Sequence, residues 1–243
     1  MDRRRGVQQP APLSWPVALA VLLAVLFLVG CGGGVGTAPS AAGASASAGA
    51  RSTAASTKGG GGMARWSFDG DPAGASPPGM TAFGGTWAVR AEPGAPSAPN
   101  ALCQTGTAEF PALALGDAAY ADVVLTARVK PIAGKEDQAA GLIVRIQDRD
   151  NYYILRANAL ENNVNLYKYV GGKRAVIKEG QATVPNGRWQ ELRLEVTGNR
   201  FRGFLDGRPV VEATDDTFQV GRVGLWTKAD SQTCFDDVEA RVP

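Results

Sequence analysis

Apolar and polar residues alternate with a period of two along most of the chain after residue 63, and this pattern limits the fold more than any other feature. In residues 192–197, two leucines and a valine alternate with Arg193, Glu195 and Thr197, and residues 123–130 repeat the pattern. A period of two is typical of β-strands, whereas an amphipathic helix needs a period near 3.6. No window longer than a few residues shows the helical period. We therefore expect an all-β fold.

Turn residues divide this region into short strands. Asp206-Gly207 lies between two apolar runs, which predicts a hairpin. Segments 70–85 and 91–99 are rich in Gly and Pro and are expected to be loops that cross between sheets. Further strands are expected at 65–69, 86–90, 100–104, 139–147, 151–158, 163–170, 174–178, 221–227 and 233–242. About a dozen strands fit one two-sheet antiparallel sandwich over residues 63–243 better than two separate domains.

The amino-terminal part has the composition of a targeting segment. Residues 1–30 combine Arg3–Arg5 with an apolar run over 17–29, which is typical of a signal peptide. The run ends at Gly30-Cys31 and resembles a bacterial lipobox, in which the cysteine is lipidated after cleavage. An uncleaved anchor with an incidental cysteine is the alternative, but the run is short for a membrane span. Residues 31–62 then form a Gly/Ala/Ser-rich linker, which we expect to be disordered.

Charge and composition exclude several functional classes. Five of the 25 basic and one of the 23 acidic residues precede residue 63, so the remainder carries a net charge of −2. A nucleic-acid partner is therefore not expected, because binding would need a surplus of Lys and Arg. The chain also has no histidine. This absence removes Ser-His-Asp catalysis, histidine-ligated zinc and any imidazole general base.

Two cysteines remain after Cys31 is assigned to the lipid. Cys103 and Cys234 form an even pair in a chain that we expect to be exported, so a disulfide between them is predicted. The prediction places an early strand beside the last or penultimate strand. Two free buried thiols are the alternative.

The order of several short motifs resembles a known superfamily. They are Ala140–Arg145, Asn151–Arg156, Asn165–Lys168, Gly171–Arg174, Gly187–Trp189, Leu205–Gly207, Gly221–Ser231 and Phe235–Asp237. This order is similar to that of concanavalin A-like lectins and glucanases, and more narrowly to laminin-G-like bacterial domains labelled 3-keto-disaccharide hydrolase. The resemblance implies a jelly roll of two curved antiparallel sheets that binds glycans on its concave sheet. No family catalytic motif is matched, and the laminarinase-type Glu-x-Asp-x-Glu strand is absent.

Strand parity indicates which side chains would meet a glycan. With Leu142, Val144, Ile146, Tyr153, Leu155, Val164, Leu166, Val223 and Leu225 in the core, the opposite side chains share one outer face. The carbohydrate-binding candidates on that face are Arg145, Tyr152, Arg156, Asn158, Asn165, Tyr167, Trp226 and Asp230. Aromatic rings stack on the C–H face of a pyranose, while Arg, Asn and Asp bond to its hydroxyls. The alternative is an ordinary sheet surface, because Tyr and Arg both suit strands.

Acidic residues offer two further sites. Asp148, Asp150, Glu161 and Asp230 are candidate catalytic carboxylates, although solvated turn acids are the simpler interpretation. Asp69 and Asp237 could hold a structural calcium between the two terminal strands, or they could cap turns.

We therefore expect a monomeric, lipid-anchored protein of the bacterial cell envelope, exposed outside the cytoplasm, whose jelly-roll domain binds carbohydrate. Its expected partners are a poly- or oligosaccharide and, through the lipid, the membrane. No cofactor is expected beyond the candidate calcium. Two alternatives stay open. One is a glycoside hydrolase of the 3-keto-disaccharide type, and the other is a structural envelope protein whose sheet face meets another protein.

Overall fold

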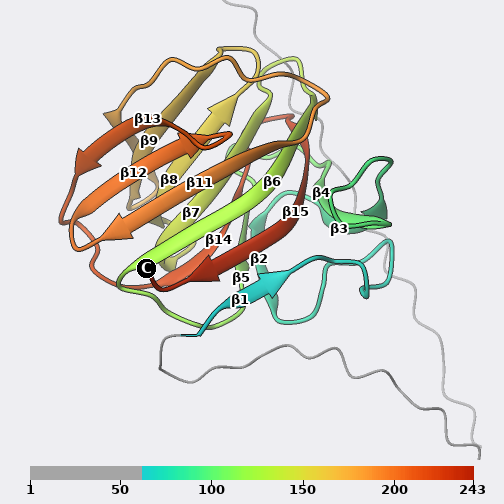
Figure 1. The fold of residues 1–243 in the computed structure, drawn as a ribbon, viewed down its shortest axis with the longest axis horizontal. Helices are drawn as coiled ribbons and strands as arrows, with labels where there is room; N and C mark the ends of the chain where they lie inside the picture. The colour runs from blue at the N-terminus through green and yellow to red at the C-terminus, as the bar shows by residue number, and fades with distance from the viewer. Residues whose placement is uncertain (1–61) are drawn as a thin grey trace, which may run out of the picture. The chain divides into compact units, whose positions relative to one another are not determined.

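The computed structural model describes residues 62–243, which form two antiparallel β-sheets packed face to face (Figure 1). The predicted signal peptide, the lipidation of Cys31 and nearly all of the linker lie outside the described residues. Within the described part of the chain, no helix is long and apolar enough to cross a membrane. The all-β jelly-roll sandwich expected from the sequence is confirmed.

The strands divide into a larger and a smaller sheet. In spatial order the eight-stranded sheet contains β13 (Arg208–Thr214), β12 (Arg200–Leu205), β11 (Gln190–Thr197), β6 (Val123–Ala133), β15 (Gln232–Arg241), β4 (Asn100–Gln104) and β3 (Trp87–Ala91), with β1 (Ala64–Trp66) paired to β15. The seven-stranded sheet contains β10 (Lys173–Lys178), β9 (Asn163–Val170), β8 (Asn151–Asn158), β7 (Ala139–Asp148), β14 (Arg222–Trp226), β5 (Ala112–Leu115) and β2 (Met80–Gly84).

The main core lies between the sheets and follows the period of two. Leu142, Leu155 and Leu166 of the seven-stranded sheet belong to one buried cluster with Leu125 and Leu192 of the other sheet. Each is fully buried, and burying a leucine side chain contributes about 1.5–3 kcal/mol. The alternation that predicted the strands therefore also places their side chains correctly in most of the sandwich.

The carboxyl-terminal strand β15 lies inside the eight-stranded sheet. One edge of β15 pairs with β6, and the other pairs with β4 and, further along, with β1. Cys103 and Cys234 are register partners on β4 and β15 and form the predicted disulfide. The bond joins residues 131 positions apart and stabilises the fold by about 5 kcal/mol in the chain-entropy treatment.

Two strands were not expected from the sequence. Segment 70–85, expected to be a loop, ends in strand β2, which pairs with β5 at the edge of its sheet. Strand β5 has the sequence Ala-Leu-Ala-Leu, and all four residues are buried. A strand covered on both faces shows no apolar–polar alternation, so the pattern that revealed the other strands is missing here.

A β-bulge in β7 overturns one part of the predicted parity. The register between β7 and β8 shifts after Val144, and Arg145 has a positive φ of 52°. The extra residue reverses the alternation that follows it. Arg145 therefore points toward Phe201 of the main core, and its guanidinium carbon lies 5.4 Å from that ring. Ile146, expected in the main core, instead joins a cluster on the outer face of the seven-stranded sheet.

Candidate functional site

The outer face of the seven-stranded sheet carries a second cluster of aromatic side chains. Tyr152, Tyr167, Tyr169 and Trp226 all lie on this face, as parity predicts. The Tyr152 and Tyr169 rings are 5.0 Å apart, and Phe110 from the loop before β5 lies 5.3 Å from Tyr169 and 5.7 Å from Trp226. These contacts bury the rings, and burial raises the pKa of the Tyr152 hydroxyl. The face is therefore covered in its centre and does not present open rings.

Small residues create the space for Trp226. A Cβ atom on Gly141, the register partner of Trp226 on β7, would lie 3.1 Å from the indole ring. Ala112 and Ala114 of β5 and Ala139 of β7 belong to the same cluster. Trp226 is fully buried although it points away from the main core. Its burial follows from the short side chains on the neighbouring strands.

A polar group, which we call the Arg156 cluster, lies beside these rings and comprises Arg156, Glu161 and Asn163. Arg156 Nη2 donates hydrogen bonds to Glu161 Oε2 at 2.5 Å and to Asn163 Oδ1 at 2.9 Å. Asn163 Nδ2 donates to the same Glu161 oxygen at 2.9 Å. The Arg156 guanidinium also lies over the Tyr167 ring, 5.3 Å from its centroid. The Arg156 side chain is 2% exposed and that of Glu161 47%, so the cluster reaches from the buried face to solvent.

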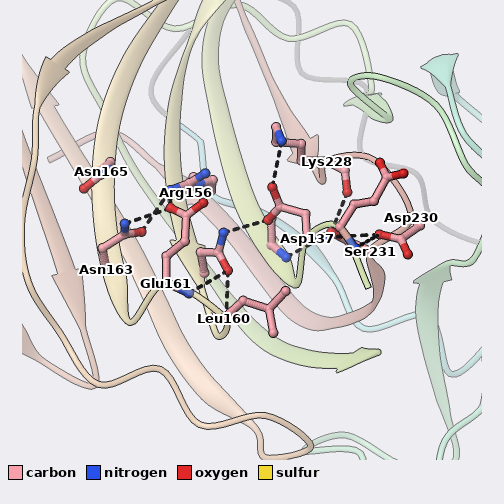
Figure 2. Close-up of polar contacts among 12 residues, drawn as sticks. Asp137, Arg156, Leu160, Glu161, Asn163, Asn165, Lys228, Asp230 and Ser231 are labelled. Atoms are coloured by element: carbon pink, nitrogen blue, oxygen red, sulfur yellow. Dashed lines mark hydrogen bonds and ion pairs between the residues drawn. The ribbon is translucent and has the colours of Figure 1, made fainter. Parts of the chain in front are cut away.

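Three loops at one end of this sheet are tied together beside the Arg156 cluster (Figure 2). Asn158 Nδ2 donates to Asp137 Oδ1 at 2.6 Å, and Asn158 Oδ1 accepts from the backbone N–H groups of Leu160 and Glu161. The other Asp137 oxygen pairs with Lys228 at 2.9 Å. Asn158 and Asp137 are buried, so this network fixes the loop that carries Glu161.

Asp230 closes the same network from the β14–β15 loop. Its carboxylate accepts backbone N–H groups of Lys135, Glu136 and Asp137. These hydrogen bonds, that from Lys135 first, lower the pKa of Asp230. Asp230 therefore holds the 134–137 loop in place, and its oxygens are occupied by that loop.

Electrostatics keep Glu161 ionised. Burial by itself would raise the pKa of this carboxyl, but the hydrogen bonds from Asn163 and Arg156 and the positive charges of Arg156 and Lys228 outweigh it. The pKa of Glu161 is therefore lower than usual. A fixed carboxylate beside a guanidinium and an amide can accept and donate hydrogen bonds to adjacent hydroxyl groups.

The remaining predicted residues fall into two groups. Asn165 lies on the same face, donates to the Tyr167 hydroxyl at 3.0 Å and accepts from the Gly180 N–H, so it links the rings to the segment after β10. Arg145 does not join the face. Its guanidinium donates to the backbone carbonyls of Ala121, Gly198 and Phe218, which ties three loops at the edge of the main core.

The two predicted calcium ligands, Asp69 and Asp237, have different partners. Asp237 pairs with Arg65 at 2.6 Å, whereas Asp69 Oδ1 accepts from the Asn100 N–H at 3.3 Å. The β15 bulge between Asp236 and Glu239 includes Asp237, whose φ is 44°. Among the described residues, one group of three potential metal ligands lies close together, namely Glu92, Cys103 and Cys234. Both of its sulfur atoms are in the disulfide. The calcium site at Asp69 and Asp237 stays a prediction.

The candidate catalytic carboxylates also separate. Asp148 accepts hydrogen bonds from the Asp150 N–H and from Asn151 Nδ2, as a turn acid does. This turn joins β7 to β8 at the opposite end of the strands from Glu161. Asp230 lies in the loop network beside the Arg156 cluster, where backbone N–H groups occupy its oxygens.

Arg174 of β10 is a functional candidate that parity arguments missed. Its guanidinium carbon lies 4.7 Å from the Tyr167 ring centroid, 5.2 Å from that of Phe110 and 5.8 Å from that of Trp226. The three rings come from three different segments. Only the assembled sheet brings them around one side chain, so the sequence gives no local signal for it.

A groove of about 390 Å³ lies on the other outer face, that of the eight-stranded sheet. Its lining residues are Arg65, Thr126, Arg128, Glu191, Arg193, Asp237, Glu239 and Arg241. Most of these charged groups already have partners, because Arg65 pairs with Asp237, Arg193 with Glu195 and Arg241 with Glu239. No aromatic residue lines this groove, so it lacks a stacking platform for a sugar ring.

Two known bacterial proteins are similar to this chain in sequence. The levanase of Bacillus subtilis (strain 168) is 27% identical over 148 residues, which are 60% of this chain and 20% of the levanase. The carbohydrate-binding module CBM66 from Bacillus subtilis superposes with a TM-score of 0.60 and 25% identity, covering 67% of this chain and 95% of the module. The chain therefore contains a domain like a carbohydrate-binding module, and its match spans about a fifth of the levanase.

A second solved structure shows the same fold, and a family match covers most of the sandwich. Domain 4 of an extracellular GH43 arabinanase from Geobacillus stearothermophilus, in complex with arabinotriose, superposes with a TM-score of 0.52 at 15% identity, covering 74% of this chain and 91% of the domain. The family described as the 3-keto-alpha-glucoside-1,2-lyase-like domain matches residues 68–241. Because this match covers more than two thirds of the sequence, the chain belongs to the 3-keto-alpha-glucoside-1,2-lyase-like domain family.

Proposed function

We propose that the domain binds carbohydrate on the outer face of the seven-stranded sheet, at the Arg156 cluster. The observation that carries this proposal is the fixed arrangement of guanidinium, carboxylate and amide described above, which a buried network holds at the solvent boundary. Adjacent sugar hydroxyls can donate to Glu161 and accept from Asn163. The loops need no large rearrangement on binding, which lowers the entropic cost of holding a ligand.

The comparisons support a saccharide as the ligand. A carbohydrate-binding module and an arabinotriose-bound domain share this sandwich, and the levanase similarity lies within a protein named for a fructan. The family name refers to a lyase, whereas of the candidate carboxylates Asp148 caps a turn, Asp230 accepts from loop N–H groups and Glu161 pairs with Arg156. Binding without cleavage is therefore the function that we infer.

Carbohydrate binding is tested by calorimetric titration with oligosaccharides from levan, inulin, arabinan and cell-wall glycans. Glu161→Gln and Asn163→Ala should each weaken binding about tenfold. The first removes the charged acceptor of a ligand hydroxyl, and the second removes the amide that donates to one. Glu195→Gln on the other sheet is the matched control and should bind like the wild type. If no saccharide binds, or if the Glu161 and control variants behave alike, the proposed site is wrong. Release of shortened saccharides during the titration would instead indicate an enzyme.

We also propose that Cys31 anchors the protein to the membrane of a bacterial cell envelope. The lipobox-like sequence supports lipidation, and residues 32–62 would act as a tether with a reach of about 30 Å. A lipid-anchored chain should partition with membranes and incorporate labelled palmitate, and Cys31→Ala should abolish both. Unchanged labelling of that variant would exclude lipidation at this position.

A further inference from the structure

Arg174 is a cation without an acidic partner on a face where the other cations are paired. Arg156 pairs with Glu161 at 2.5 Å, and Lys228 pairs with Asp137 at 2.9 Å. Within residues 62–243, no carboxylate oxygen lies within 4.0 Å of the Arg174 guanidinium, and no hydrogen bond from it is formed. Its Nη1 atom is shielded from solvent and has no acceptor. One positive charge therefore remains uncompensated on this face.

Aromatic rings hold this charge in place. The Tyr167 ring contacts two guanidinium groups, with Arg174 at 4.7 Å and Arg156 at 5.3 Å. Contact with ring faces stabilises a cation by about 0.5–2 kcal/mol, depending on how far it is desolvated. Ring contacts do not use the N–H donors, and of the three guanidinium nitrogens only Nη1 is shielded from solvent, so the Nε–Nη2 edge of Arg174 remains available for an acceptor from outside the protein.

The acids that act on Tyr169, the register partner of Arg174, do not take that role. Glu109 and Asp150 both act on the Tyr169 hydroxyl, whose pKa is raised by burial first and then by these two charges. Asp150 lies 3.9 Å from Arg149, and Glu109 is exposed in the loop beside Phe110. Neither acid forms an ion pair with Arg174.

We propose that Arg174 recognises a carboxylate on the bound saccharide, so that the preferred ligand class is an oligosaccharide containing uronic acid. This inference rests on the proposed carbohydrate-binding function and deepens it. A guanidinium pairs with a carboxylate through two parallel N–H···O bonds, which neutral hydroxyls cannot match in strength. The sugar would lie between the Arg156 cluster, which bonds to its hydroxyls, and Arg174, which bonds to its carboxylate.

The test compares acidic oligosaccharides with their neutral counterparts. Oligomers of galacturonate, glucuronate and mannuronate are titrated beside the same oligomers with their carboxyl groups reduced, so that only the charge differs. At least one acidic oligomer should bind the wild type about tenfold more tightly than its reduced form, because a charge-assisted pair contributes about 1.5 kcal/mol or more. The ratio should shrink as salt is added, because salt screens the interaction.

Variants then assign the selectivity to one side chain. Arg174→Gln should bring the ratio of acidic to neutral affinity close to one, and Arg174→Lys should restore part of it. Lys173→Gln is the matched control, because Lys173 is an exposed cation next to Arg174 on the same strand. It should keep the wild-type ratio. Thermal melting of each variant verifies that the edge strand β10 remains folded.

The outcomes separate this inference from the proposed function. If neutral saccharides bind as tightly as acidic ones, or if Arg174→Gln leaves the ratio unchanged, the domain binds carbohydrate but Arg174 does not select a charge. In that case Arg174 only clamps β10 to the loop of Phe110. If no saccharide of either kind binds, the carbohydrate-binding function itself is wrong and the inference falls with it.

Discussion

On the outer face of the eight-stranded sheet, charged side chains pair with one another at the surface, with Arg193 and Arg202 lying over the Phe204 ring, whereas on the outer face of the seven-stranded sheet a cluster of several aromatic rings is buried. Arg200 and Glu212 are 2.7 Å apart with side chains 55% and 54% exposed, and Glu195 pairs with both Arg193 and Arg202. On the other face Arg156 and Trp226 are almost completely buried. The same alternation of side chains thus produces a surface of charged pairs on one sheet and a second packed layer of aromatic rings on the other.

The difference shows which face can bind a ligand strongly. Exposed ion pairs are screened by solvent and contribute little, so a ligand gains little by replacing them. A buried guanidinium or amide is already desolvated, so a ligand that completes its hydrogen bonds gains more. We therefore place the binding function on the seven-stranded sheet, although the groove of about 390 Å³ lies on the other.

The largest effect that would test this comparison is the removal of Trp226. If the outer face of the seven-stranded sheet is a second core, Trp226→Ala should lower the free energy of unfolding by about 3–5 kcal/mol, through lost burial and the cavity that remains. Urea unfolding measures the loss. Arg202→Ala, on the opposite outer face, should lower it by less than about 1 kcal/mol. Equal losses for the two variants would contradict the distinction between the faces.

A smaller effect should appear in the pH dependence of stability. The pKa of Glu161 is lower in the folded protein than its usual value, so its contribution is complete above about pH 4.5 and is lost as the pH falls through the folded pKa. Glu161→Gln should therefore be less stable than the wild type near neutral pH, and this difference should narrow in acid. Because the side chain is half-exposed, the effect should be well below that of Trp226→Ala. A difference that widens in acid would contradict the direction of the shift.

The smallest effect concerns the outer face of the eight-stranded sheet. A double-mutant cycle on Arg200 and Glu212 should give a coupling free energy of about 0.2–1 kcal/mol that decreases with added salt. A salt-independent coupling above about 2 kcal/mol would mean that this face is shielded in solution. That result would suggest that another molecule covers the ion pairs.

Much of the sandwich could be predicted because strand alternation is a local property. The inward positions of Leu142, Leu155 and Leu225 and the outward positions of Tyr152 and Trp226 follow from it. The disulfide could also be predicted, because only two cysteines remain outside the proposed lipid site.

The rest depends on events that alternation cannot encode. One inserted residue at the β7 bulge turns Arg145 from the outer face to three backbone carbonyls. The covering of the outer face depends on Phe110 and Arg174, which belong to segments that the sheet brings together only after folding. The ion pair of Asp237 with Arg65 joins residues 172 positions apart, which alternation also cannot encode.

The central position of β15 has a consequence for how the chain reaches this structure. Hydrogen bonds from β15 hold β6 on one side and β4 and β1 on the other, so β1 and the β3–β4 pair cannot join the rest of the sheet until β15 is available. A nascent chain that lacks residues 232–241 would leave the edges of β4 and β6 open to other chains. Assembly of the sandwich must therefore wait until β15 has been synthesised.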